Sequence, residues 1–193
     1  MRHFFGFSSL LFFLAITPAA YAQTPQQPVA TPGNLSRIIN DFQFNFQHIT
    51  GELLIENPQT TEYGSELCLN GAEQCTITRY SAKGKPVYSF QAKMPATEDF
   101  NKVKKQYQEL FKQAIQVVLT VGENAYQLTG TYAEPSESLA FNSILLTPDS
   151  KEKAIRKLKV EILLEADMLE WNIRVLVYDR EREDDERGAI KEN

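Results

Sequence analysis

The segment Glu170–Asp179, which decides the fold, is Glu-Trp-Asn-Ile-Arg-Val-Leu-Val-Tyr-Asp. Its alternate positions form two rows: Trp171, Ile173, Val175 and Val177 in one, and Asn172, Arg174, Leu176 and Tyr178 in the other. A period of two is typical of a β-strand. Because the second row also contains large apolar side chains, both faces of this strand are expected to be at least partly covered.

The residues before this strand allow two interpretations. Residues 159–165 alternate like a strand, whereas the apolar positions from Ile155 to Ile162 also fit a helix. We favour one or two helical turns at residues 149–157, followed by a strand at 159–165. If the helix instead continues to Ala166, residues 86–179 follow a ferredoxin-like β-α-β-β-α-β order, with an N-terminal helix and hairpin as an extension.

Two main helices are expected further upstream. The clearer one covers residues 97–118, whose apolar stripe consists of Phe100, Val103, Tyr107, Leu110, Phe111, Ala114, Ile115 and Val118. Thr97 is expected to cap it. The second covers residues 35–47 with Asn34 as N-cap, although Phe42, Phe44 and Phe46 also alternate like a strand.

Candidates for further strands lie at residues 53–55, 67–69, 75–81, 86–94, 125–133 and 139–147, with a loop at 60–64. The sequence therefore predicts one α+β domain at residues 34–180. Its mainly antiparallel sheet has about six or seven strands and is packed by the two helices.

The N-terminus predicts export. Arg2 and His3 precede an apolar run, and Ala20-Tyr-Ala22 is a typical cleavage site, so residues 1–22 are expected to be a signal peptide. Residues 23–33 are rich in Pro and Gln and are expected to be a disordered leader. Residues 181–193 are expected to be a charged, disordered tail. No transmembrane segment is expected in the mature chain.

The two cysteines, Cys68 and Cys75, are expected to form a disulfide, which suits an oxidising compartment. With a four-residue loop at residues 70–73, Cys68 lies opposite Cys75 in a hairpin, close enough for a bridge. A two-residue Asn-Gly loop would place Cys68 opposite Glu73 instead. The spacing does not fit a C-x-x-C redox motif.

The inventory of side chains argues against the common catalytic sites. After loss of residues 1–22, His48 is the single histidine, and we expect it to be half-buried and structural. No residue is therefore predicted to be catalytic, to bind a cofactor or to bind a metal. Loss of Arg2 leaves 19 basic and 25 acidic residues, a net charge of −6, which argues against nucleic acid as a partner.

The expected function is that of an exported, non-catalytic binding or structural module with an unknown protein or small molecule as partner. The alternative is a secreted hydrolase that uses only carboxylates. The possible binding face contains Trp171, Leu176 and Tyr178, on the strand with apolar residues in both rows. The expected contact surface is the sheet face away from the helices, unless residues 35–55 cover it.

Overall fold

The computed structural model describes residues 33–81 and 85–179. The expected signal peptide at 1–22, nearly all of the leader and the tail at 181–193 lie outside these residues. The described residues form two helices, α1 (Asn34–Asp41) and α2 (Phe100–Ile115), and a short 3-10 helix, η1 (Phe42–Phe44). They also form nine strands: β1 (Thr50–Glu56), β2 (Thr60–Ser65), β3 (Gln74–Tyr80), β4 (Val87–Lys93), β5 (Val118–Val121), β6 (Asn124–Thr129), β7 (Phe141–Pro148), β8 (Leu158–Asp167) and β9 (Glu170–Asp179).

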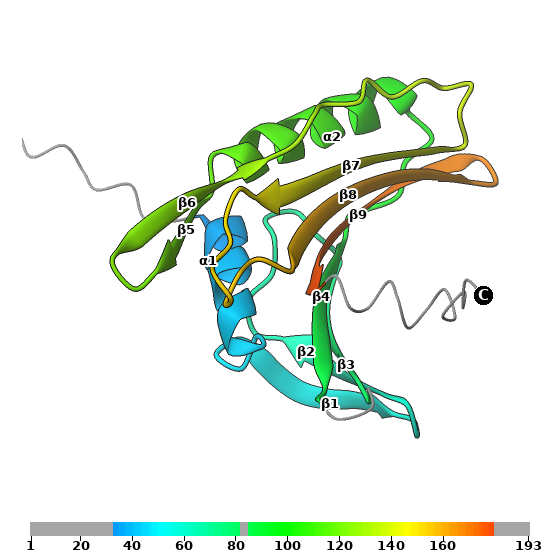
Figure 1. The fold of residues 1–193 in the computed structure, drawn as a ribbon. Helices are drawn as coiled ribbons and strands as arrows, with labels where there is room; N and C mark the ends of the chain where they lie inside the picture. Colours follow the sequence, from blue (N-terminus) through cyan, green and yellow to red (C-terminus); the bar gives the residue numbers. More distant parts are fainter. Residues whose placement is uncertain (1–32, 82–84, 180–193) are drawn as a thin grey trace, which may run out of the picture. The chain divides into compact units, whose positions relative to one another are not determined.

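The nine strands lie in the order β1-β2-β3-β4-β9-β8-β7-β6-β5 (Figure 1). Each neighbouring pair is antiparallel. The fold is thus α+β with a mainly antiparallel sheet and two main helices. The expected number of six or seven strands was wrong, because β2 and β5 lie where the sequence pattern indicated a loop and the end of a helix.

Both helices pack on one face of the sheet, here called the helical face. Trp171, Ile173, Val175 and Val177 of β9 belong to the same buried cluster as residues of α1 and α2. The cluster also contains Phe90 of β4 and Ile162 of β8, each with no exposed surface. Burial of the alternate residues of three central strands under two helices provides the main core.

Helix α2 begins later and ends earlier than the predicted helix at 97–118. Asp99, rather than Thr97, caps it, because its Oδ1 accepts a hydrogen bond from the Lys102 backbone N–H at 3.0 Å. Val103, Tyr107, Leu110 and Ala114 form its buried stripe. Ile115, expected in this stripe, is 36% exposed, and Val118 begins β5 instead.

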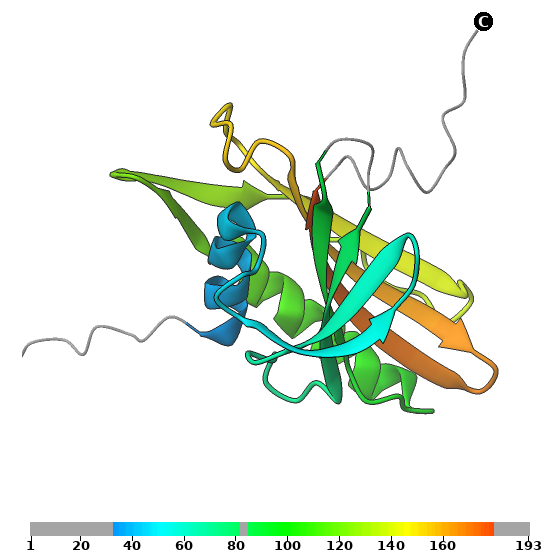
Figure 2. The same cartoon turned by 90° about the horizontal axis from the view of Figure 1, so that it is seen from below.

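The predicted helix at 35–47 is divided into α1 and η1. Asn45 and Phe46 follow η1 with φ angles of 55° and 58°, so the left-handed backbone ends the helical segment. Asn34 is not the cap, since its side chain donates a hydrogen bond to the Cys68 carbonyl at 2.8 Å. Figures 1 and 2 show the β5–β6 hairpin beside α1, where the Asn40 side chain accepts a hydrogen bond from Thr120 N.

Residues 158–167 form strand β8, and residues 153–157 form a turn. The ferredoxin-like alternative was therefore wrong, as were the helical turns at 149–157. The strand prevails because β8 pairs along its whole length with β9, from Leu158 opposite Asp179 to Asp167 opposite Glu170. In this register Val160, Ile162 and Leu164 all point to the helical face, where burial is greatest.

Candidate functional site

The residues of the predicted binding face lie on opposite sides of the sheet. Leu176 and Tyr178 point away from the helices, to what is here called the outer face. Trp171 lies in the core cluster of the helical face, with its ring centroid 4.9 Å from that of Phe100. The period of two along β9 separates them, so the structure does not bring these three side chains together.

The alternative that residues 35–55 cover the outer face is not seen. Leu35, Ile38, Ile39 and Phe46 belong to the cluster of the helical face. On the outer face, Leu163, Leu176 and Tyr178 instead form a separate small cluster. The Tyr178 hydroxyl donates a hydrogen bond to Glu161 Oε2 at 2.9 Å, and this bond helps to fix the ring on the sheet.

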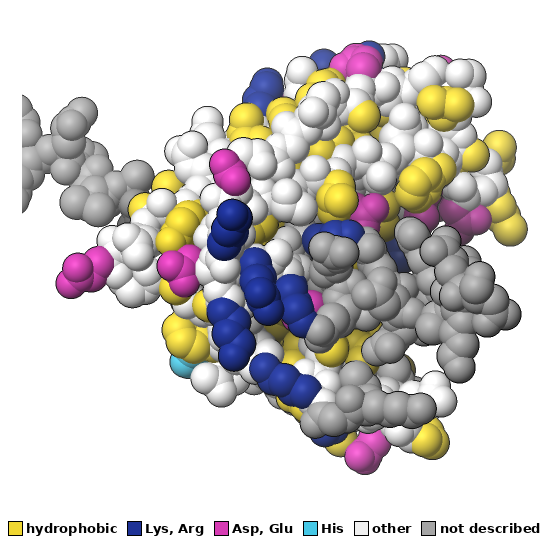
Figure 3. All heavy atoms as spheres, in the orientation of Figure 1, with side chains coloured by type: hydrophobic (Ala, Val, Ile, Leu, Met, Phe, Trp, Pro, Cys, Tyr) yellow, Lys and Arg dark blue, Asp and Glu magenta, His cyan; other side chains and the backbone are white. Residues whose placement is uncertain are grey.

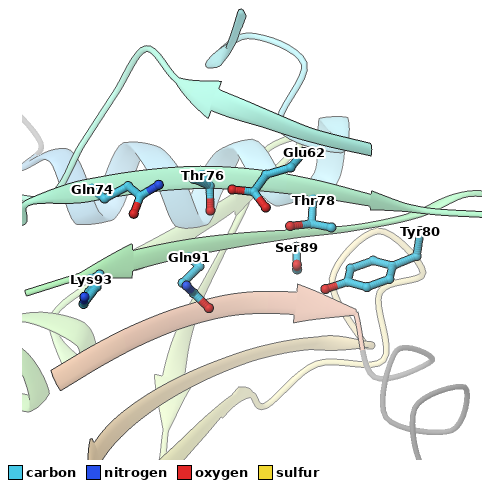
Figure 4. Close-up of a pocket in the computed structure, with 8 residues that line it drawn as sticks. All are labelled: Glu62, Gln74, Thr76, Thr78, Tyr80, Ser89, Gln91 and Lys93. Atoms are coloured by element: carbon cyan, nitrogen blue, oxygen red, sulfur yellow. The ribbon is translucent and has the colours of Figure 1, made fainter. Parts of the chain in front are cut away.

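A polar groove lies on the same outer face, over β2, β3 and β4 (Figure 4). Its volume is about 150 Å³. Every residue that lines it has a polar side chain: Glu62, Gln74, Thr76, Thr78, Tyr80, Ser89, Gln91 and Lys93. The groove meets the apolar cluster, because Gln91 pairs with Leu176 and Ser89 pairs with Tyr178 across β4 and β9.

The strand register explains why these polar side chains converge. Thr76 lies opposite Gln91, and Thr78 lies opposite both Ser89 and Glu62. Directly opposed residues of an antiparallel sheet point to the same side with Cβ atoms roughly 5 Å apart. The pairs therefore form parallel rows of hydroxyl and amide groups, as Figure 4 shows, with Tyr80 at one end of the groove.

The chemistry of the groove is that of hydrogen bonding rather than of charge. Six of its eight side chains are neutral, and Glu62 and Lys93 are the two ionic ones. Thr and Ser hydroxyls and Gln amides both donate and accept hydrogen bonds, so they suit a ligand that also does both. The alternation of polar residues at 74–80 and the neighbouring strand at 86–94 were visible in the sequence, but β2 was predicted as a loop, and the register of the three strands was not predicted.

The disulfide expected between Cys68 and Cys75 is present, with a Cα–Cα distance of 5.4 Å. The hairpin expected around it is wrong, because the strand that precedes β3 is Thr60–Ser65 rather than residues 67–69. Residues 66–73 form a connection in which Leu69 is buried. The disulfide holds this connection against the helical face, since Cys75 belongs to the core cluster of that face and Cys68 packs against it.

His48 does not lie in the groove and is exposed rather than half-buried. Its Nδ1 contacts Asp41 Oδ1, and its backbone N–H donates to Asp41 Oδ2 at 3.2 Å. The buried Asp41 carboxylate thereby holds the turn that contains Asn45 and Phe46. This arrangement gives His48 a structural contact.

Three further observations bear on function. Among residues 33–81 and 85–179, no group of three or more His, Cys, Asp or Glu side chains is placed to hold a metal ion. In the same part of the chain, no helix has the length and apolarity that crossing a membrane requires. Comparison with protein-family models, with curated proteins and with solved structures finds no match.

Proposed function

We propose that this chain is an exported, non-catalytic binding protein whose outer sheet face holds a neutral, hydroxyl-rich ligand, of which a saccharide is the representative class. The observation that carries the proposal is the polar groove with its rows of Thr, Ser and Gln side chains. Saccharide hydroxyls donate and accept hydrogen bonds, as these side chains do. Tyr80 provides an aromatic ring against which the apolar face of a sugar could pack.

The groove supports binding better than the alternative of a carboxylate-dependent hydrolase. Two-carboxylate glycoside hydrolysis requires carboxyl groups roughly 5–10 Å apart on either side of the scissile bond. Glu62 is the one carboxylate that lines the groove among the described residues. On the neighbouring strands, Glu161 accepts a hydrogen bond from Tyr178, and Glu165 pairs with Arg174.

Binding can be tested with a glycan array, followed by titration calorimetry of the saccharide that the array selects. The Thr78→Val and Gln91→Val double variant removes hydrogen-bonding groups but retains side chains that favour strands. We expect it to weaken binding by at least tenfold, since two hydrogen bonds to the ligand are lost. Ser143→Ala, on the outer face of β7 but outside the groove, is the matched control and should bind normally.

Two outcomes would contradict the proposal. An array without any bound saccharide would exclude the ligand class, and binding unchanged in the double variant would exclude the groove. Export is tested separately by N-terminal sequencing of secreted protein, which should begin at Gln23. A mature protein that retains residues 1–22 would contradict export by this route.

A further inference from the structure

The β8–β9 hairpin ends in an exposed apolar turn. Asp167 pairs with Glu170, so Met168 and Leu169 form a two-residue loop. Their side chains are 98% and 81% exposed. Met168 has a φ angle of 54°. In two-residue loops, Asn or Gly usually occupies a position with this left-handed conformation. The turn does not require large apolar side chains at these two positions, and an unfavourable backbone conformation is often found at functional sites.

The apolar surface continues onto the neighbouring strand. Phe141, at the start of β7, lies opposite Glu165 of β8 and is 56% exposed. Leu139, just before β7, is 52% exposed. Together Leu139, Phe141, Met168 and Leu169 form what is here called the apolar tip. Contiguous exposed apolar surface of this kind marks an interaction site.

Acidic side chains flank the apolar tip. Asp167 and Glu170 lie on either side of Met168-Leu169, and both are exposed. Neither carboxylate forms an ion pair within the part of the chain that the structure describes, whereas Glu165 pairs with Arg174. The surface that fits this tip is therefore an apolar cavity with basic residues at its rim.

A cavity of this kind lies at the opposite end of the same hairpin. Its volume is about 530 Å³, within the range of cavities that enclose a drug-sized molecule. Phe42, Phe46, Pro86, Val87 and Tyr88 provide its apolar wall. Lys85, Lys153, Arg156 and Lys157 line it as well, together with Glu152 and Asp179.

The acids of this cavity already have partners. The Glu152 carboxylate accepts a hydrogen bond from the Tyr126 hydroxyl at 3.2 Å. Burial raises the pKa of the Asp179 carboxyl, and the charges of Lys157 and Lys85 oppose this rise. Lys153 and Arg156, in contrast, form no ion pair with any described residue. Figure 3 shows Lys and Arg side chains gathered near the centre of the view, and hydrophobic and acidic ones at its right edge.

We propose that the apolar tip of one copy of this chain docks into the basic, aromatic-walled cavity of a second copy. Met168 and Leu169 contact the wall formed by Phe42 and Tyr88. Asp167 and Glu170 pair with Lys153 and Arg156. Each of these four charges lacks an ionic partner within the described part of its own chain, and the contact between copies supplies one. The flanking acids also make the tip unsuited to an anionic lipid surface, which would repel them.

The geometry predicts how the copies assemble. Strand β8 begins at the cavity and ends at the apolar tip, and its 10 residues span roughly 33 Å. The two contact surfaces are therefore different and lie at opposite ends of one hairpin. Such a contact is heterologous, so it adds copies head to tail instead of closing a symmetric pair.

The test is sedimentation of the full exported chain over a range of concentrations. The wild type should form a concentration-dependent series of oligomers that dissociates as salt is raised. Met168→Asn with Leu169→Ser changes only the tip, and Asn suits the left-handed turn. Lys153→Glu with Arg156→Glu changes only the cavity rim. Each double variant alone should remain a monomer, because it lacks one of the two contact surfaces.

A mixture of the two double variants is decisive. Each retains one intact surface, so the mixture should form a one-to-one dimer that does not grow further. A single chain that carries Asp167→Lys, Glu170→Lys, Lys153→Glu and Arg156→Glu should regain self-association, since the charges are exchanged across the contact. Leu54→Asp and Lys102→Glu, on exposed positions of β1 and α2, are controls that should associate like the wild type.

Other results would overturn the proposal. The proposal is wrong if the wild type stays monomeric at concentrations up to about 1 mM, because a weaker affinity would not indicate a specific contact. It is also wrong if the mixture of the two double variants stays monomeric. Binding of the tip to vesicles of phosphatidylglycerol without self-association would assign the tip to a membrane. Because the groove variant T78V/Q91V leaves both surfaces intact, failure of saccharide binding and failure of self-association are separate results.

Discussion

The two faces of strand β9 differ although the same ten residues form both. On the helical face, Trp171, Ile173, Val175 and Val177 belong to a cluster that reaches both helices. The apolar residues of both faces are buried, so the faces differ in the size of the cluster and not in exposure. On the outer face, Leu176 and Tyr178 join only Leu163 in a cluster of three, and Arg174 forms an ion pair. One face therefore provides the core, and the other combines a small apolar cluster with polar groups.

Under the proposed function, this difference separates the face that provides stability from the face that binds a ligand. Burial under helices removes the largest apolar area from water and so contributes most to the free energy of unfolding. On the outer face, polar side chains of β3 and β4 line a groove, in which Thr78 and Gln91 are half-buried and Thr76 and Ser89 are buried. Substitutions there are expected to change binding more than stability, and substitutions on the helical face the reverse.

The largest effect is expected for Phe90→Ala on the helical face. Phe90 has no exposed surface, so its loss should lower the free energy of unfolding by roughly 3–5 kcal/mol. Phe141→Ala, on the outer face and 56% exposed, should cost less than about 1 kcal/mol. Urea denaturation measures both. Equal losses for the two residues would refute the contrast between the faces.

The next effect concerns the disulfide between Cys68 and Cys75. Cys68→Ala with Cys75→Ala should lower the free energy of unfolding by about 2–3 kcal/mol, because the unfolded chain regains the entropy of a short loop. Addition of a reductant to the wild type should give a similar loss and no effect on the variant. A much larger loss would contradict an effect of loop entropy alone and would assign part of the loss to the packing of Cys75 in the core.

A smaller effect, of opposite sign, is expected for Tyr107→Phe in α2. The Tyr107 hydroxyl is buried and has no hydrogen-bond partner among the described residues. Removing it should raise the free energy of unfolding by about 1 kcal/mol, since the polar group no longer has to be desolvated. A measured decrease would show that a partner outside the described residues satisfies this hydroxyl.

The last effect is a dependence of stability on alkaline pH. Burial is the main cause that raises the pKa of Tyr132 from 10.0 to about 12, and it raises the pKa of Tyr107 above its usual range. Above pH 10, the two phenols are therefore ionised in the unfolded chain but still protonated in the folded one. The contribution of the two protonated phenols to the free energy of unfolding is fully present below pH 10 and is lost as pH rises from 10 through 12.

Urea midpoints measured between pH 9 and pH 11 test this dependence, with the range kept below pH 12 to avoid chemical damage. Tyr132→Phe should make the decline with pH shallower. Tyr126→Phe, whose hydroxyl contacts Glu152 near the surface, is the matched control. A decline that is unchanged in the Tyr132 variant would assign the alkaline transition to other groups.

The elements that have a strong local period could be predicted from the sequence. The apolar stripe of α2 and the two rows of β9 follow from side-chain spacing alone, because these spacings place residues on one face of a helix or strand. The cysteine pairing was also predictable, since the chain contains two cysteines seven positions apart. The compartment inferred from residues 1–22 stays a prediction.

The other elements and the groove depend on contacts between residues that are distant in the sequence. Residues 158–167 satisfy both periods, and pairing with β9 selects the strand. Strands β1 and β5 have weak patterns because they lie at the edges of the sheet, where a strand buries little, as the exposed Leu53, Leu54 and Ile55 of β1 show. Strand β2 lies between β1 and β3 but buries a single residue, Thr61. The groove depends on register: Glu62, Thr78 and Ser89 come together only when β2, β3 and β4 pair in one alignment. Local spacing fixes which way a side chain points, but only long-range pairing fixes which side chain lies beside it.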